Sequence, residues 1–190
     1  ALMVATMDTK DKTINVMNIP RDTMCNNTAT GASKKINAAY GMDTGGKGGN
    51  IEQTSKEIER LMGFRPDKYV IVNFDGIAAI VDAIGGVDYD VPFDMKYDDP
   101  SQNLHIDLKK GQQHLDGKQT VGFLRWRHNN DYTVQYTNGD EGRVENQQKF
   151  LKALAGQVLQ IKNVTKIRSI AEAVFKNVKT DFSAGELLWM

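Results

Sequence analysis

The sequence is poor in cysteine and histidine, which excludes two common kinds of site. Its 190 residues contain a single cysteine, Cys25, and three histidines, His105, His114 and His128. One cysteine forms no intramolecular disulfide and builds no cysteine metal cluster, and the histidines do not have zinc-motif spacing. We therefore expect neither a disulfide scaffold nor a zinc centre.

The chain also lacks an excess of charge and a long apolar run. Its 24 basic and 24 acidic residues give a formal net charge of zero, whereas a general nucleic-acid-binding protein would carry a basic excess. No apolar run approaches the roughly 20 residues of a membrane-spanning helix, and no signal peptide is visible. The chain opens inside a hydrophobic run, Ala1–Met7, and ends in mid-pattern at Leu187–Met190. We interpret it as a piece of a longer protein.

The patterns that are present predict one α/β domain over residues 1–190, a length sufficient for a substantial core. Leu2–Met7 and Thr13–Ile19 predict a β-hairpin. Further strands are predicted over Tyr69–Val72, Val87–Val91 and Leu104–Leu108, and helices over Lys35–Tyr40, Ile51–Met62, Phe74–Ile84, Lys118–Trp126, Gly142–Lys162 and Thr165–Val178. This alternation favours an α-β-α sandwich, with a mixed central sheet and helices on both of its faces.

Three arginines that bracket one polar loop form the best candidate for a binding site. Arg125 and Arg127 lie at the end of one predicted helix, and Arg143 opens the next. Guanidinium groups match phosphate oxygens bidentately, and a helix N-terminus adds free N–H groups. Gln147 lies four residues after Arg143 and so shares its helix face. This arrangement predicts an anion site; the alternative is a solvated, charged helix start.

Carboxylates at two strands are weaker candidates. Pro20 ends a predicted strand, which puts Arg21 and Asp22 at a strand exit, where functional side chains often lie. The alternative is an ordinary turn with a solvated arginine. Asp88 and Asp90 share one face of a strand and could hold a metal, but we favour the solvated face of an edge strand.

Six motifs stand in one order along the chain. They are Asn18–Thr23 (NIPRDT), Lys35–Tyr40 (KINAAY), Val81–Pro92 (VDAIGGVDYDVP), Gly111–Gly117 (G-x-x-x-L-D-G), Arg125–Arg127 (RWR) and Gly139–Gln148 (GDEGRVENQQ). Together they resemble the LytR-CpsA-Psr family over nearly the whole chain. Its members are cell-envelope enzymes of mainly Gram-positive bacteria. They transfer glycopolymers, such as wall teichoic acid or capsule, from an undecaprenyl-pyrophosphate carrier to peptidoglycan.

The resemblance implies a fold, a location and residue roles. It implies an α-β-α sandwich with a groove for the polyprenyl tail, outside the cell behind a single N-terminal transmembrane anchor. It matches Arg21 to the family's catalytic arginine. It matches Arg125, Arg127 and Arg143 to the pyrophosphate-binding arginines, and Gln147 to a phosphate-contacting glutamine. Arginines preset around a pyrophosphate would stabilise the charge that builds on the leaving phosphate.

Other assignments rest on position alone. Asp140 matches the family's acidic residue before the last arginine, and Asp22 and Asp140 are the candidates for the base that deprotonates an acceptor sugar hydroxyl. Asn146 stands where many members have arginine, which would remove one auxiliary phosphate contact. Four apolar residues are candidates for lining a lipid tunnel, although core packing is the plainer role for each. They are Ile71, Val81, Ile84 and Leu154.

The resemblance also implies Mg²⁺ (or Mn²⁺) beside the pyrophosphate. The family's first strand, and an aspartate that usually stands just before the position of Ala1, are absent from this sequence. We therefore expect the metal-binding carboxylates before Ala1, in the parent protein. Two alternatives to a glycopolymer–peptidoglycan ligase are a non-catalytic module that binds polyprenyl (pyro)phosphates and a pyrophosphatase that acts on the lipid carrier.

Overall fold

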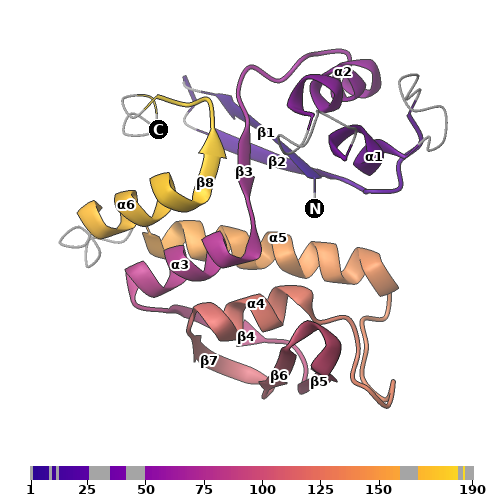
Figure 1. Ribbon diagram of the computed structural model, residues 1–190, viewed down its shortest axis with the longest axis vertical. Coiled ribbons are helices and arrows are strands. Elements are labelled where there is room, and N and C mark those ends of the chain that lie inside the picture. Colours follow the sequence, from indigo (N-terminus) through magenta and orange to yellow (C-terminus); the bar gives the residue numbers. More distant parts are fainter. Residues whose placement is uncertain are drawn as a thin grey trace. The chain divides into compact units, whose positions relative to one another are not determined.

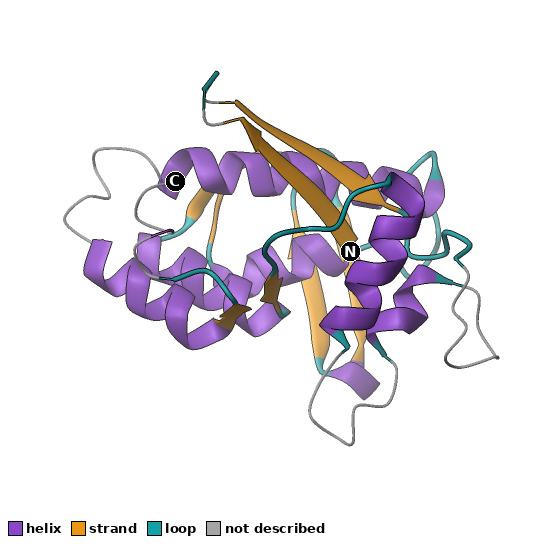
Figure 2. Ribbon diagram, turned by 90° about the horizontal axis from the view of Figure 1, so that it is seen from above, coloured by secondary structure: helices purple, strands orange, loops and turns teal. Residues whose placement is uncertain are grey.

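A computed structural model describes residues 2–8, 10–11, 13–25, 35–41, 50–158, 167–183 and 186. The chain divides into two compact units, Ala1–Tyr69 and Val70–Met190, and each is described by itself. Figure 1 labels their helices and strands, and Figure 2 distinguishes them by type. None of the helices in the described residues combines the length and the hydrophobicity of a membrane span.

The first unit contains the predicted hairpin and two helices. Its elements are β1 (Leu2–Asp8), β2 (Thr13–Ile19), α1 (Ile36–Tyr40) and α2 (Ile51–Met62). The two strands are antiparallel, with Leu2 opposite Ile19 and Asp8 opposite Thr13, so the hairpin is confirmed. Its core is small, because Val4 is the buried residue of β1 and packs with Ile19 and with residues of α1 and α2. Most positions of β1 are therefore partly or fully exposed.

Local capping signals explain where α2 begins and ends. The side chain of Asn50 accepts a hydrogen bond from the Gln53 N–H at 2.9 Å. Gly63 ends the helix in the left-handed conformation, with φ of 79°, and its N–H donates to the Glu59 carbonyl. The Gln53 side chain donates to Glu57 Oε1 instead of completing a capping box.

The second unit contains the remaining elements. They are β3 (Val70–Val72), α3 (Phe74–Ile84), β4 (Val87–Val91), β5 (Met95–Asp99), the 3-10 helix η1 (Pro100–Gln102), β6 (Leu104–Leu108), β7 (Gly111–Leu115), α4 (Gly117–Arg125), α5 (Gly139–Val158), α6 (Ile167–Asn177) and β8 (Val178–Thr180). The mixture of helices and strands confirms the α/β class. Its described strands form the antiparallel pairs β3–β8, β4–β7 and β5–β6. A mixed sheet was expected, but every pairing in the described residues is antiparallel.

Three strands of this unit were not predicted. Strand β5 runs to Asp99 and is followed directly by the 3-10 turn Pro100–Gln102. In β5 and β7 the buried positions alternate with polar ones, but few of them are apolar, so the period-2 signal is weak. Helix α5 begins at Gly139 rather than at the predicted Gly142. The predicted continuation of that helix to Lys162 lies outside the described residues.

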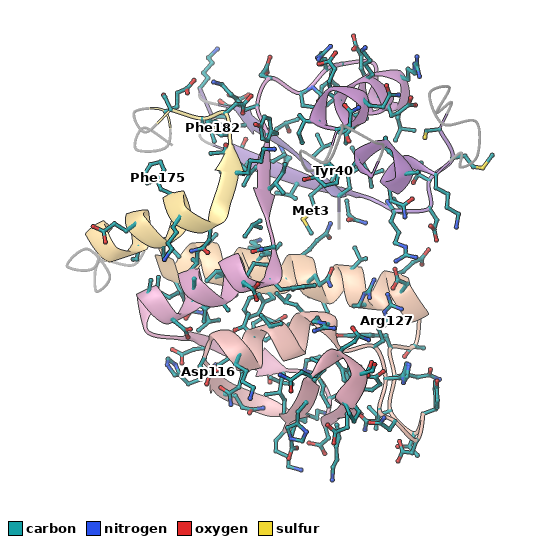
Figure 3. The ribbon with its side chains drawn as sticks, viewed as in Figure 1. Met3, Tyr40, Asp116, Arg127, Phe175 and Phe182 are labelled. Carbon is teal, nitrogen blue, oxygen red and sulfur yellow. The ribbon has the colours of Figure 1, made fainter. Side chains whose placement is uncertain are left out.

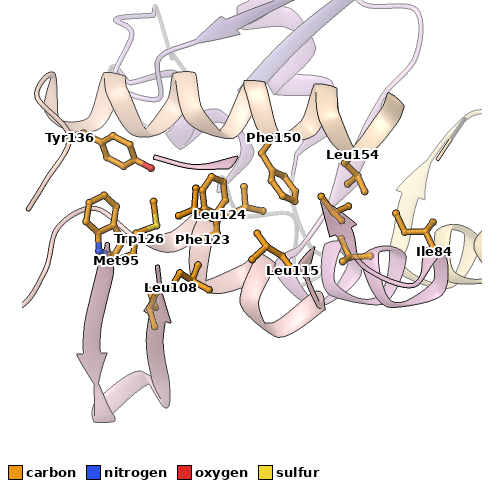
Figure 4. Close-up of a cluster of buried hydrophobic side chains, with 14 of the residues drawn as sticks. Ile84, Met95, Leu108, Leu115, Phe123, Leu124, Trp126, Tyr136, Phe150 and Leu154 are labelled. Atoms are coloured by element: carbon orange, nitrogen blue, oxygen red, sulfur yellow. The ribbon is translucent and has the colours of Figure 1, made fainter. Parts of the chain in front are cut away.

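The core of the second unit lies between α5 and the elements α4, β4 and β7. Phe123 of α4, Trp126 and Phe150 of α5 are its largest fully buried side chains. Figure 4 shows Phe150 and Leu154 pointing from α5 toward Phe123 and the other core side chains. The Phe123 and Phe150 ring centroids are 5.3 Å apart. This packing fixes α4 against α5, the two helices that carry the predicted arginines.

Candidate functional site

The RWR segment places two arginines around a buried tryptophan. Helix α4 ends at Arg125, and the backbone of Trp126 is extended, with φ of −62° and ψ of 140°. The Trp126 ring is buried against Phe93 and Tyr136, at centroid distances of 5.7 and 5.1 Å. Because successive side chains of an extended segment point to opposite sides, Arg127 is directed away from this core. Figure 3 shows Arg127 beside the start of α5.

Asp140 joins two of the three predicted arginines. Its Oδ1 lies 2.6 Å from Arg143 Nη2 and 3.9 Å from Arg127 Nε. The Arg143 side chain is only 13% exposed, whereas that of Arg127 is 54% exposed. Asp140 belongs to the first turn of α5, where the helix dipole favours negative charge. The N-terminus of α5 therefore holds two guanidinium groups around one carboxylate.

Arg125 and Gln147 have different contacts from this pair. Arg125 Nη2 donates to Gln102 Oε1 at 2.5 Å, and its guanidinium carbon lies 5.9 Å from the centroid of the Phe74 ring. Gln147 Nε2 donates to the Leu124 carbonyl at 2.7 Å. Gln147 thus connects α5 to the end of α4 directly before Arg125. Its predicted contact with phosphate stays a prediction.

Two tyrosines that sequence reasoning missed support the start of α5. Tyr89 Oη donates to Asn146 Oδ1 at 3.2 Å, and Asn146 Nδ2 donates to Tyr136 Oη at 2.7 Å. Burial raises the pKa of Tyr136 to about 12, which keeps this phenol neutral. A Cβ at Gly142 would lie 2.9 Å from the Tyr136 Cβ, so α5 approaches this ring closely. The only sequence signal was Tyr136 itself, an aromatic residue shortly before a helix.

In the first unit, Arg21 and Asp22 lie in the turn after β2. Asp22 Oδ1 is 3.1 Å from Lys35 Nζ and 3.6 Å from Arg21 Nε. The hydrogen bond from Lys35 lowers the pKa of Asp22 below its usual value, and Arg21 adds to the effect. The Asn37 N–H donates to the Arg21 carbonyl at 3.1 Å, which fastens the turn to α1. Lys35 was not predicted as the partner of Asp22, although the two residues lie in the motifs Asn18–Thr23 and Lys35–Tyr40.

A sequence profile described as the LytR_cpsA_psr family matches residues 1–190. The chain belongs to the LytR_cpsA_psr family. It is 37% identical over 189 residues to the polyisoprenyl-teichoic acid–peptidoglycan teichoic acid transferase TagV of Bacillus subtilis, covering 98% of this chain and 45% of TagV. It is 32% identical to the transferase TagU of Halalkalibacterium halodurans, covering 95% of this chain and 54% of TagU. The chain thus spans about half the length of these curated relatives.

Solved structures of the LytR_cpsA_psr family have the same fold. The crystal structure of B. subtilis TagV superposes with a TM-score of 0.76 at 36% identity, covering 98% of this chain and 67% of that chain. A LytR-Csp2A-Psr enzyme from Actinomyces oris gives a TM-score of 0.75 at 18% identity, covering 98% and 68%. The second likeness supports the fold alone. The α/β class inferred from the sequence is therefore that of the family.

The apolar residues predicted to line a lipid tunnel have ordinary core positions. Val81, Ile84 and Leu154 are buried in the core of the second unit. Ile71 is the central residue of β3 and is half-buried. Core packing accounts for the burial of Val81, Ile84 and Leu154 without a bound lipid. Contact with a polyprenyl tail stays a prediction.

The described residues do not supply the metal site that the LytR_cpsA_psr family implies. Among them, no group of three or more His, Cys, Asp or Glu side chains could hold a metal ion. Asp88, considered with Asp90 as a possible ligand pair, instead has its Oδ1 2.7 Å from His114 Nδ1. Both aspartates are on the exposed face of β4. Mg²⁺ therefore stays a prediction.

Proposed function

We propose that this chain is a phosphotransferase domain that moves a glycopolymer, such as wall teichoic acid, from an undecaprenyl-pyrophosphate carrier to peptidoglycan. The observation that carries the proposal is the Arg127–Asp140–Arg143 cluster at the N-terminus of α5. Family membership and the names of TagV and TagU support the same reaction. Two guanidinium groups at a helix N-terminus are suited to a pyrophosphate.

In this reaction, a sugar hydroxyl of peptidoglycan attacks the phosphorus that carries the glycopolymer. The bond from that phosphorus to the bridging oxygen breaks, and polyprenyl phosphate leaves with the electron pair. Arg127 and Arg143 would stabilise the charge that develops on the leaving phosphate. Arg143 is already held in place by Asp140, so little reorganisation is needed when the substrate binds.

We propose Arg21 as a catalytic arginine, and Asp22 or Asp140 as the base that removes the hydroxyl proton. The contacts of Asp22 and Asp140 affect how readily each carboxylate can accept this proton. The lowered pKa of Asp22 makes its carboxylate a weaker base. Asp140 is engaged by Arg143, and it would have to release that contact to accept a proton. The proposal also includes Mg²⁺ as cofactor and a location on the outer face of the cell membrane, behind an anchor in the parent protein.

A transfer assay tests the proposal. It combines a synthetic polyprenyl-pyrophosphate glycan donor with peptidoglycan oligomers, with and without Mg²⁺. We expect transfer by the protein, no turnover by Arg21→Ala, and retained donor binding in that variant. Binding without transfer would instead favour the non-catalytic module. Release of polyprenyl phosphate without an acceptor would favour the pyrophosphatase.

A further inference from the structure

The loop that connects α4 to α5 presents one exposed aromatic ring. Tyr132 is 64% exposed, and its backbone has φ of 58°. Residues other than glycine rarely adopt this left-handed conformation, and they persist in it only where the surrounding structure holds them. The structure therefore fixes Tyr132 in a conformation that its own backbone disfavours.

Neighbouring rings and backbone contacts hold this tyrosine. The rings of Tyr132 and His128 are stacked, with centroids 4.2 Å apart and an interplanar angle of 18°. Tyr97 of β5 meets the His128 ring edge-on at 5.6 Å. The Tyr132 N–H donates to the Asn129 carbonyl at 3.0 Å, and the Asn129 N–H donates to the Val134 carbonyl at 2.8 Å. One face of the tyrosine ring lies on His128, and its high exposure leaves the other face to solvent.

Two asparagine side chains fasten the same loop to β5. Asn129 Oδ1 accepts from the Lys96 N–H at 2.7 Å, and its Nδ2 donates to the Asp94 carbonyl at 3.2 Å. Asn130 Oδ1 accepts from the Asp98 N–H at 2.7 Å, and its Nδ2 donates to the Asp98 carbonyl at 3.0 Å. Each amide thus both donates and accepts, as a neighbouring strand would. The aromatic surface is therefore pre-organised, which lowers the entropy cost of binding a ligand.

The two segments that hold the ring carry more carboxylates than cations, which disfavours a phosphate ligand. Within Asp94–Asp98 and residues 129–133 there are three carboxylates, those of Asp94, Asp98 and Asp131, and one lysine, Lys96. The Thr133 N–H and hydroxyl donate to Asp131 Oδ1, which keeps the pKa of this carboxyl below its usual value. An excess of carboxylates repels a phosphate, but such groups accept hydrogen bonds from hydroxyl groups.

We propose that Tyr132, stacked on His128, is a saccharide-binding platform for a pyranose ring. The apolar C–H face of a pyranose fits a flat exposed aromatic ring, and its equatorial hydroxyls reach outward to acceptors such as Asp131. The loop connects Arg127 to Asp140 along the chain, so it links two residues of the proposed anion site. A role of this platform in the reaction rests on the proposed function. In that role, the platform would position a sugar of the glycan acceptor or of the donor.

The direct test is the binding of a β-1,4-linked N-acetylglucosamine tetrasaccharide to the full chain, followed by ligand-observed NMR. Tyr132→Asn removes the ring but keeps a residue that tolerates the left-handed conformation. We expect it to weaken binding about tenfold or more, with an unchanged or higher Tm. Tyr132→Phe should bind like the unaltered protein. The exposed tyrosine Tyr40 provides the control, and Tyr40→Ala should have no effect.

Unchanged affinity in Tyr132→Asn would overturn the platform. The transfer assay then separates the two sources of the sugar, because a raised KM for peptidoglycan identifies the acceptor and a raised KM for the donor identifies its glycan. Weakened binding with both KM values unchanged would overturn a role in the reaction. If the unaltered protein transferred nothing yet bound the tetrasaccharide through Tyr132, the platform would stand and the proposed function would fail.

Discussion

Arg127 and Arg143 carry the same charge beside the same carboxylate, but they are held differently. Arg143 is nearly buried and lies 2.6 Å from Asp140, whereas Arg127 is exposed and lies 3.9 Å from it. An exposed ion pair at that distance contributes little to stability. A substitution of Arg127 is therefore expected to change ligand binding without changing the fold.

We predict that Arg127→Ala weakens the binding of a soluble isoprenyl pyrophosphate by about 10–100-fold, because a charge-assisted hydrogen bond contributes roughly 1.5–3 kcal/mol. Isothermal titration calorimetry measures the affinity, and a thermal melt should show an unchanged Tm. Lys149→Ala is the matched control, since Lys149 is an exposed cation on the same helix, paired with Glu145. Equal losses in the two variants would mean that only the overall charge attracts the ligand.

Tyr136 predicts a pH dependence of stability. Its pKa is raised to about 12 in the folded protein, against about 10 for an ordinary tyrosine. The folded state therefore disfavours the phenolate. The contribution of Tyr136 to stability is fully present below about pH 10 and is lost as the pH rises toward 12. Urea unfolding at about pH 8 and about pH 11 should show a smaller loss in Tyr136→Phe than in the unaltered protein. The same loss in both would contradict this role.

At the scale of elements, one glycine sets the distance between α3 and α4. A Cβ at Gly117 would lie 2.5 Å from the Ala78 carbonyl oxygen and 2.7 Å from Asp82 Oδ2. The Gly117 N–H also donates to Asp82 Oδ1 at 2.8 Å. The first residue of α4 is thus in direct backbone contact with α3, and no larger residue fits without displacing one of the two helices.

Gly117→Ala should destabilise the protein by about 1–3 kcal/mol, as overpacking does. Gly156→Ala is the opposite case, because no atom lies within 4 Å of a Cβ at Gly156 in α5. It should stabilise the protein by about 0.4–1 kcal/mol, since alanine reduces the entropy of the unfolded chain. Urea denaturation of both variants measures the difference. A change of the same sign in both would refute the close α3–α4 contact.

The helices could be predicted because their end signals are local. Asn50 and Asp116 cap α2 and α4 from within a few residues. The strands β5 and β7 could not, because few of their buried positions are apolar and the period-2 signal is weak, and β8 is only three residues long. In the site, local spacing was predictable, whereas a contact between residues far apart in the sequence was not. Spacing predicted that Arg143 and Gln147 share a helix face, but only the fold shows that Gln147 donates to the Leu124 carbonyl.

At the scale of the whole molecule, the two units have cores of very different size. The first relies on a small cluster that includes Val4 and Ile19, while the second has an extensive aromatic core around Phe123 and Phe150. Regions with few buried apolar contacts open at lower free energy. This difference implies unequal local stability along the chain.

Hydrogen exchange followed by mass spectrometry should therefore show faster exchange of amides in β1 and β2 than in α4 and β7. We expect protection factors lower by about tenfold or more in the hairpin. A peptide from α5 around Phe150 provides the internal reference, because its core side chain is fully buried. A single common rate for all these segments would show that the chain opens as one unit.

The asparagine contacts of the α4–α5 loop also bear on how copies of this protein meet one another. An open strand edge offers unpaired N–H and C=O groups to the next molecule, and this is a common route to aggregation. Asn129 and Asn130 occupy such groups on β5, and Gln157 does the same on β4 through the N–H and carbonyl of Asp88. The side-chain amides of Asn129, Asn130 and Gln157 thus pair with backbone groups to which an additional strand could otherwise bind. We expect replacement of these amides to promote self-association, which light scattering would detect as an increase in mean particle mass.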